Sequence, residues 1–131
     1  MRREGILNPA LESAIAAVGH TEYLVVGDCG LPMPGEANIL DLSLVRGIPT
    51  FMQVLDAVKG EMVIESFIYA EEAETANPGI VEQIRQALPD VPSVKMSHED
   101  FKKETQRAKT VIRTGEYSSY ANIILVGGVN F

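Results

Sequence analysis

Hydrophobic residues follow two different patterns along this chain, and the two patterns alternate. Three sets have helical spacing: Leu11, Ile15 and Val18; Phe51, Val54, Leu55 and Val58; and Ile80, Val81, Ile84 and Leu88. Short apolar or alternating runs predict β-strands at residues 23–28, 39–44, 61–69, 91–97, 110–115 and 121–128. In the run at 39–44, leucines alternate with polar residues, which is typical of a half-buried strand. Helices that alternate with apolar strands indicate an α/β fold, with helices on both faces of one sheet.

Capping signals define the expected ends of several helices. Asn8–Pro9 and Asn77–Pro78 each place a capping side chain before a proline, which the first helical turn tolerates. Gly19 is the expected end of the first helix. Ser97 is followed three residues later by Asp100, a variant of the capping box, and predicts a further helix.

Composition narrows the class of protein. With 46% hydrophobic and 22% charged residues, the chain can bury a core and is expected to form one domain, residues 1–131. We predict a single three-layer α/β/α domain with a mostly parallel or mixed central sheet. The formal net charge of −7 argues against nucleic acid or an anionic membrane as partner, because both would require an excess of Lys and Arg.

Several features bear on location in the cell. Cys29 is the sole cysteine, so no disulfide can form within the chain, which suits a reducing compartment. The N-terminal segment lacks the uninterrupted apolar stretch of a signal peptide. No apolar run approaches the roughly 20 residues needed to span a bilayer. We therefore expect a soluble, cytoplasmic protein.

Two histidines and an aspartate are the titratable residues best suited to chemistry. His20 and His98 are candidates because an imidazole exchanges protons near neutral pH. His20 could instead lie just beyond a helix end and bond to the free carbonyl groups there. His98 could face solvent from a first helical turn. Asp28 follows an apolar strand, where α/β sheets often carry a functional carboxylate, but it could also cap a turn. These three residues could bind a metal, yet no i, i+4 pair or second cysteine supports it, so none is expected.

Three further polar residues surround the last predicted turn. Tyr117, Tyr120 and Asn122 combine phenols with an amide, which suits recognition of a polyhydroxylated ligand. Ordinary turn chemistry and packing at a sheet edge would produce the same pattern. Cys29 has no evident basic neighbour to activate its thiol, so we expect it to pack as a small residue.

Five separated motifs resemble the D-ribose pyranase family, which belongs with the fucose mutarotases in one superfamily. In chain order they are "GILN", "VGHTEYLVVGDCGLPMP", "LDLSLVRGIPTF", "MSHEDFK" and "IRTGEYSSYANIILVGGV". Together they run from the first residues to the last, although residues 71–95 carry little recognisable pattern. One departure is Cys29, where relatives more often have alanine or serine.

This resemblance implies an isomerase that interconverts the pyranose and furanose forms of D-ribose, with no cofactor and no metal. The family's catalytic histidine falls on His20 in "GHT". Its substrate-binding residues fall on Asp28 in "GDCG", His98 in "SHED", and Tyr120 and Asn122 in "YAN", with Lys102 in "EDFK" as a further match. The resemblance also implies a homo-oligomer, a pentamer or decamer, whose pockets lie at subunit boundaries.

The spacing of His20 and Asp28 bears on this expectation. They lie eight positions apart, or roughly 26 Å if fully extended at about 3.3 Å per residue, which far exceeds a ribose. Either the chain doubles back at residues 19–22, or two subunits share each pocket. We expect a shared pocket, in agreement with the resemblance.

Two other functions stay open at this point. The same chemistry could act on another aldose such as fucose, depending on the shape of the pocket near Tyr117 and Tyr120. The chain could also be a non-catalytic sugar-binding subunit of a ribose transport system. That role would not need a histidine that transfers protons, so the "GHT" motif at His20 favours an enzyme.

Overall fold

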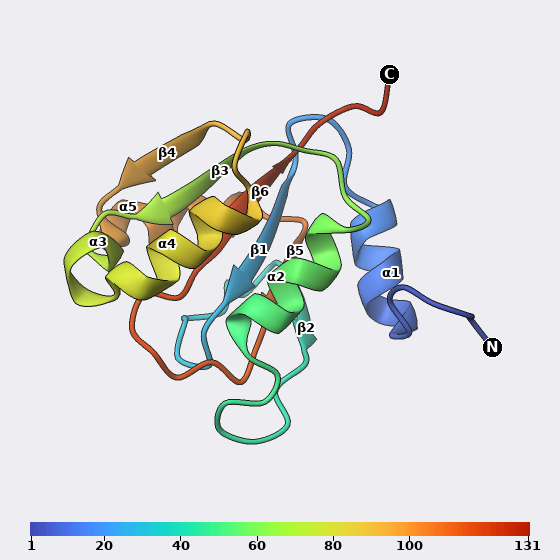
Figure 1. The fold of residues 1–131 in the computed structure, drawn as a ribbon, viewed down its shortest axis with the longest axis horizontal. Coiled ribbons are helices and arrows are strands. Elements are labelled where there is room, and N and C mark those ends of the chain that lie inside the picture. The colour runs from blue at the N-terminus through green and yellow to red at the C-terminus, as the bar shows by residue number, and fades with distance from the viewer.

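The structure is a computed structural model and describes residues 1–131. Six strands form one sheet: β1 (Tyr23–Gly27), β2 (Asn38–Asp41), β3 (Ile64–Ala70), β4 (Ser93–Met96), β5 (Thr110–Arg113) and β6 (Ile123–Gly127). The helices are α1 (Pro9–Ala16), α2 (Phe51–Lys59), α3 (Ala73–Ala76), α4 (Pro78–Ala87) and α5 (His98–Glu104), with a 3₁₀ turn at Thr105–Arg107 (Figure 1). Of these, only α3 and the 3₁₀ turn were not predicted, because both are too short for a periodic pattern. None of the helices combines the length and the apolar composition needed to cross a membrane.

The sheet is mixed, with strand order β2-β5-β1-β6-β3-β4. Strands β2, β5 and β1 are parallel, β3 and β4 are parallel, and β6 runs antiparallel to its neighbours β1 and β3. In β1, the side chains of Leu24, Val25 and Val26 are completely buried. A strand covered on both faces is apolar at successive positions, which explains the unbroken apolar run in the sequence.

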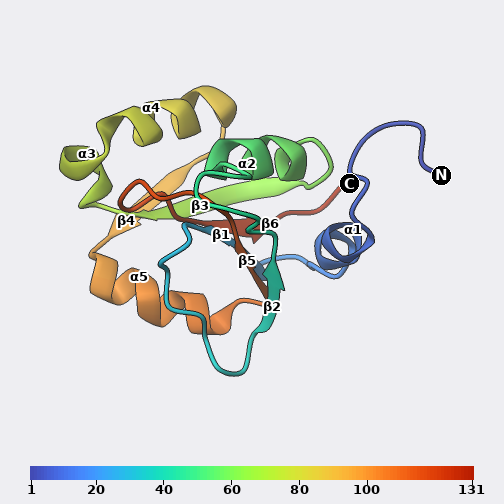
Figure 2. The same ribbon diagram turned by 90° about the horizontal axis from the view of Figure 1, so that it is seen from below.

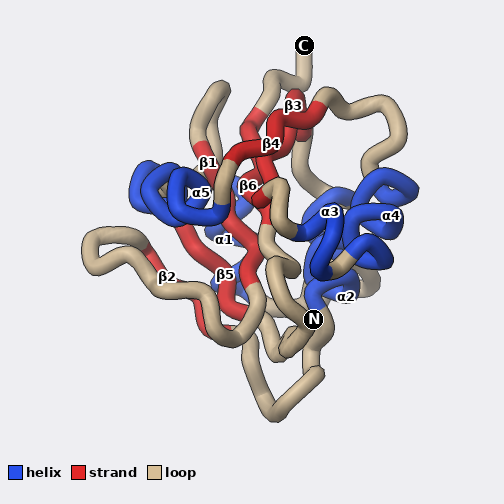
Figure 3. Tube along the Cα trace, turned by 90° about the vertical axis from the view of Figure 1, so that its left-hand side faces the viewer, coloured by secondary structure: helices blue, strands red, loops and turns tan.

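Helices cover both faces of the sheet, and each face has its own hydrophobic core. Figures 2 and 3 show α2, α3 and α4 on one face and α5 on the other. The larger core contains residues of α1, α2 and α4, including Leu11, Phe51 and Ile84. In the smaller core, Phe101 of α5 packs with sheet residues such as Val111. The predicted three-layer α/β fold with a mixed sheet is therefore confirmed.

The start of α1 agrees with the prediction, but its end does not. Asn8 caps the helix by accepting a hydrogen bond from the Leu11 N–H at 2.9 Å. The helix ends at Ala16 instead of Gly19. The chain turns earlier because the Gly19 N–H is bound by the carboxylate of Glu22, at 2.7 Å, and not by a helical carbonyl.

The two later capping signals have different outcomes. Ser97 caps α5, where its Oγ accepts the Asp100 N–H at 3.2 Å. Asn77 precedes α4 but makes no capping hydrogen bond. Its amide donates instead to Ser118 Oγ at 3.0 Å and to the Ser119 carbonyl at 2.8 Å. The predicted cap at Asn77 is therefore wrong, because distant partners occupy the side chain.

The strand predicted at residues 39–44 is shorter than expected. Strand β2 ends at Asp41, and a tight turn follows in which the Leu44 N–H bonds to the Ile48 carbonyl at 2.9 Å. Leu44 is 76% exposed, so the half-buried alternation is wrong at this end of the run. The physical reason is that β2 is an edge strand with β5 as its one neighbour, and the chain leaves the sheet before Leu44.

Candidate active site

A pocket of about 320 Å³ opens at the carboxyl end of β1. Its walls come from residues 28–32 after β1, His98 at the start of α5, and residues 116–120 and Asn122 before β6. The topology explains this convergence, because β1 and β5 are parallel neighbours whose following loops leave the sheet at one edge. Strand β6 is antiparallel to β1 and therefore begins at the same edge.

Asp28 and Asn122 are joined by two hydrogen bonds in this pocket. The Asp28 N–H donates to Asn122 Oδ1 at 2.8 Å, and Asn122 Nδ2 donates to Asp28 Oδ2 at 3.0 Å. The Gly30 N–H donates to Asp28 Oδ1 at 2.9 Å. Each carboxylate oxygen has a further lone pair that can accept a hydrogen bond from a ligand. The carboxylate is therefore held in place without being saturated.

Burial is the main influence on the carboxyl group of Asp28. It raises the pKa of Asp28, because a charged group loses solvation there. Hydrogen bonds from the Gly30 N–H and the Asn122 amide lower the pKa of Asp28, since they favour the ionised form. His98 also lowers this pKa, by a smaller amount. A perturbed carboxyl group in a pocket is typical of a functional site.

His98 and Tyr120 meet on another wall of the pocket. Their rings pack edge to face with centroids 5.0 Å apart, and His98 also stacks on Phe101 at 6.3 Å. The backbone N–H of His98 donates to both carboxylate oxygens of Glu72, at 3.0 and 2.9 Å, which fixes the start of α5. Nδ1 of His98 is buried without a hydrogen-bond partner. His98 is therefore a half-buried pocket residue and not a solvent-facing one.

Glu116 organises the segment before β6, although the sequence patterns did not single it out. Its carboxylate accepts the Phe51 N–H at 3.2 Å and both the N–H and the hydroxyl of Ser118, at 3.2 and 3.0 Å. Ser118 and Ser119 line the pocket and are held by the amide of Asn77. The only sequence feature that could have identified these residues is their position in the last motif. Residues of a loop follow no hydrophobic periodicity that would mark them.

His20 lies at the other end of β1 and does not line this pocket. Its side chain is 55% exposed, and Nε2 lies 2.9 Å from Oε2 of Glu65. The chain turns at residues 19–22, but the turn passes directly into β1 and does not return His20 towards Asp28. One chain therefore brings together four of the predicted site residues, Asp28, His98, Tyr120 and Asn122, without His20.

Lys102 and Tyr117 lie at the periphery. Lys102 follows His98 by one helical turn, forms an ion pair with Glu99 at 2.7 Å and does not line the pocket. Tyr117 lines the pocket and is 60% exposed. The guanidinium of Arg46 lies 4.2 Å from the centre of its ring, a cation–π contact at the surface.

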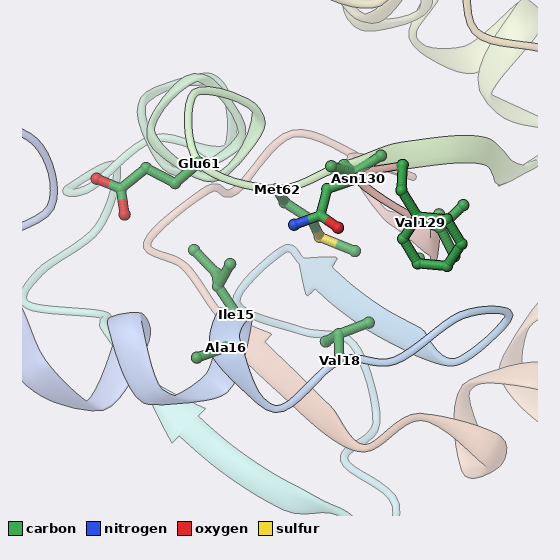
Figure 4. A pocket seen from close by; sticks show the side chains of 11 residues that line it. Ile15, Ala16, Val18, Glu61, Met62, Val129 and Asn130 are labelled. Atoms are coloured by element: carbon green, nitrogen blue, oxygen red, sulfur yellow. The ribbon is translucent and has the colours of Figure 1, made fainter.

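A second cavity, of about 300 Å³, lies at the opposite end of the sheet, where β6 ends. Figure 4 shows it between the end of α1, Val18 in the segment that follows, the segment that carries Glu61, and the C-terminal residues Val129 and Asn130. Its lining is mostly apolar, and the carboxylate of Glu61 already accepts the Ile6 N–H at 2.9 Å. Because a polar ligand needs several converging polar groups, the pocket beside Asp28 is the better candidate.

The pocket beside Asp28 offers hydrogen-bonding groups of both kinds. Two carboxylates accept, while an amide, two phenols, an imidazole and two hydroxyl groups can donate or do both. Cys29 lines the pocket as a free, half-buried thiol. No group of three or more His, Cys, Asp or Glu side chains in the chain is placed to hold a metal ion. The arrangement suits a small polyhydroxylated ligand.

Comparisons with known proteins cover the whole chain. A relative named D-ribose pyranase from Geobacillus thermodenitrificans (strain NG80-2) is 51% identical over 131 residues, which is 100% of this chain and 99% of the relative. A D-ribose pyranase from Clostridium botulinum (strain Eklund 17B / Type B) is 45% identical and covers 100% of both chains.

Solved structures give the same picture. The structure of Bacillus subtilis RbsD complexed with D-ribose superposes with a TM-score of 0.96, at 40% identity and 100% coverage of both chains. The fucose mutarotase of Streptococcus pneumoniae in complex with L-fucose has a TM-score of 0.81, at 23% identity and 95% coverage of both. At that lower identity the likeness shows the fold alone.

A sequence model of one protein family matches all but one residue of this chain. The sequence model of the RbsD / FucU transport protein family matches residues 1–130. It covers all five motifs on which the resemblance was based, and the relatives named above share the full length of the chain. This chain belongs to the RbsD / FucU transport protein family.

Proposed function

We propose that this protein is a D-ribose pyranase, a cofactor-independent isomerase that interconverts the pyranose and furanose forms of D-ribose. The observation that carries this proposal is a polar pocket, lined by Asp28, His98, Tyr120 and Asn122, in a chain 51% identical to a relative of that name. The ribose complex of a relative 40% identical supports the same sugar.

The reaction requires two proton transfers. A base removes the proton of the anomeric hydroxyl while an acid protonates the ring oxygen, which opens the cyclic hemiacetal. Closure through a different hydroxyl then changes the size of the ring. A positioned acid–base group contributes about 10²–10⁴-fold to such a step. The uncatalysed reaction already proceeds in water, so the proposal asks only for a modest acceleration.

In this proposal, the pocket residues hold the sugar and His20 moves the proton. The carboxylate of Asp28 accepts sugar hydroxyls, and Asn122 keeps that carboxylate in its orientation. His98 and Tyr120 complete the hydrogen-bonding wall. Lys102 reaches the sugar in this scheme after leaving its ion pair with Glu99.

We further propose that His20 acts in the pocket of a neighbouring copy of the chain. The five residues of β1 span roughly 16 Å at about 3.3 Å per residue, so Asp28 and His20 of one chain cannot share a sugar. The exposed imidazole of His20 is free to meet a second subunit. The expected assembly is a homo-oligomer, a pentamer or decamer as the family resemblance implies. The unpaired thiol of Cys29 supports a reducing compartment such as the cytoplasm.

Saturation-transfer NMR of D-ribose tests the function directly. We expect the wild-type protein to accelerate exchange between the pyranose and furanose signals, and to do so less for L-fucose. His20→Ala should return exchange to the uncatalysed rate while still binding ribose, with an unchanged circular dichroism spectrum and oligomer size. Wild-type exchange in His20→Ala would contradict the role of this residue. Absence of acceleration by the wild-type protein would contradict the enzymatic function and favour a sugar-binding subunit.

A further inference from the structure

The turn that carries His20 is fixed to the end of β6 by backbone hydrogen bonds. The Thr21 N–H donates to the Gly127 carbonyl at 2.8 Å, and the Gly127 N–H donates to the Glu22 carbonyl at 2.9 Å. Within the turn, the carboxylate of Glu22 accepts the Gly19 N–H at 2.7 Å. The backbone is therefore held on both sides of His20, while the imidazole stays exposed.

Gly127 permits this close approach because it has no side chain. A Cβ at this position would lie 2.5 Å from the carbonyl oxygen of Gly19 and 2.7 Å from the side chain of Val18. Thr21 has a φ of 67°, a conformation that a threonine keeps only where its surroundings enforce it. The location of His20 is thus a rigid feature of the fold.

Glu65 faces His20 from a β-bulge in β3. Ile64 and Ser66 pair with two adjacent residues of β6, so Glu65 between them is an extra residue without a partner in the ladder. Bulges redirect side chains and are frequent beside functional sites. Here Oε2 of Glu65 lies 2.9 Å from Nε2 of His20. Two independent irregularities, the strained turn and the bulge, therefore bring these two side chains together.

The chemistry of this contact determines which ring nitrogen carries the proton. An ionised carboxylate can only accept a hydrogen bond, so Nε2 of His20 must be the donor to Glu65. In the neutral imidazole the other nitrogen, Nδ1, then has a free lone pair. In the protonated imidazole, Nδ1 carries the proton that can be delivered.

We propose that Glu65 is a positioning residue that fixes the tautomer and ring orientation of His20, so that Nδ1 is the atom that exchanges a proton with the sugar. This inference rests on the proposed function of His20. The proton balance is simple: Nδ1 takes up a proton from one sugar oxygen and returns one to another, while the proton on Nε2 stays in the bond to Glu65. Glu65 itself does not touch the sugar.

A surface ion pair without function is the alternative explanation. Both side chains are partly exposed, at 55% for His20 and 39% for Glu65, and exposed ion pairs contribute little to stability. A structural pair would leave kcat unchanged when it is removed. The two explanations therefore differ in a kinetic readout and in a spectroscopic one.

The experiment compares Glu65→Ala and Glu65→Gln with Glu82→Gln. Glu82 is an exposed glutamate on α4 whose carboxylate accepts a hydrogen bond from the Gln86 amide at 3.2 Å, so it controls for the loss of one charge. We expect Glu65→Ala to lower kcat for ribose ring exchange about tenfold. This loss is smaller than the rate acceleration of about 10²–10⁴-fold that the positioned acid–base group itself contributes. KM should stay unchanged. Glu65→Gln should be intermediate, because an amide oxygen can still accept from Nε2 but no longer excludes the other tautomer.

The spectroscopic arm uses ¹⁵N NMR of the imidazoles at a pH where they are neutral. The chain has only two histidines, and His20→Ala assigns their signals. The wild-type protein and Glu82→Gln should show His20 with the proton on Nε2, and Glu65→Ala should show a mixture of tautomers. Wild-type kcat in Glu65→Ala, or a proton on Nδ1 in the wild-type protein, would overturn the proposal. Should His20→Ala remain fully active, the assigned role of His20 fails, and the NMR spectra still report separately on whether Glu65 fixes the tautomer.

Discussion

Asp28 shows how one residue can be both buried and available to a ligand. Its carboxylate is held by the Gly30 N–H and the Asn122 amide, yet it lines an open pocket. The burial that raises the pKa of Asp28 also strengthens each hydrogen bond made in the pocket, because the local dielectric constant is lower than that of water. Asp28 is therefore expected to contribute strongly to ribose affinity.

Replacing Asp28 by asparagine tests this contribution. An amide offers one acceptor oxygen where the carboxylate offers two, and it lacks the charge. We expect Asp28→Asn to weaken ribose binding at least about tenfold, since a hydrogen bond to a charged group contributes about 1.5–3 kcal/mol. Isothermal titration calorimetry measures the change. Asp90→Asn, the same substitution at an exposed position outside the pocket, should leave the affinity unchanged.

The pH dependence of binding follows from the direction of the pKa shift. Burial raises the pKa of Asp28, so the folded chain binds this proton at a higher pH than the unfolded chain does. Ribose affinity should fall as the pH drops through this raised pKa, because protonation removes an acceptor. Between the ordinary and the raised pKa, the free energy of unfolding decreases as the pH rises, since the folded state binds more protons. Calorimetric titrations with ribose at several pH values should show this fall in affinity in the wild-type protein. The same fall in Asp28→Asn would contradict its assignment to Asp28.

At the scale of secondary-structure elements, two identical Asn–Pro pairs have different roles. Asn8 caps α1 through the Leu11 N–H. Asn77 precedes α4 but ties it to Ser118 and Ser119, which line the pocket. The dipeptide marks the start of a helix in both cases, whereas the partner of its side chain depends on what the fold places beside it.

Alanine at each position separates these roles. Asn8→Ala should lower the free energy of unfolding by about 1 kcal/mol, the usual cost of losing an N-cap, without changing ribose affinity. Asn77→Ala should weaken ribose binding, because the segment at 118–119 loses two hydrogen bonds. Urea unfolding and calorimetric titration of both variants measure the two effects. Equal ribose affinity in the two variants would show that Asn77 does not support the pocket.

At the scale of the whole molecule, the sheet keeps His20 and Asp28 apart. The turn with His20 lies where β1 begins and β6 ends, and the Asp28 pocket lies at the opposite edge. No rearrangement of one chain that preserves β1 brings them together. The proposed active site therefore requires a second copy.

Co-expression of His20→Ala with Asp28→Asn tests the shared site, at a ribose concentration too low to fill sites that carry Asn in place of Asp28. If His20 and Asp28 act from different subunits, random assembly of His20→Ala with Asp28→Asn leaves both residues intact in about a quarter of the sites. Ribose exchange should then recover to about that fraction of the wild-type rate. Co-expression of His20→Ala with the double variant should recover none. Full activity of a monomer at high dilution, or no recovery in the mixture, would contradict a shared site.

The predictable part of this protein is local. Helical and strand periodicities, the caps at Asn8 and Ser97, and the buried run of β1 depend on neighbouring residues, so the amino-acid sequence is enough to predict them. The motifs also indicated the family and the residues of the candidate site. Asp28, His98, Tyr120 and Asn122 do meet in one pocket.

Which distant groups meet follows from the three-dimensional fold. The sequence could not reveal that Asn77 binds the segment at 118–119, that Leu44 lies outside the sheet, or that a bulge turns Glu65 towards His20. These contacts depend on strand order and register, which arise from the packing of the whole chain and leave no periodic signal. The elements and the chemical groups are therefore predictable from local sequence patterns, whereas the partners of those groups are set by the fold.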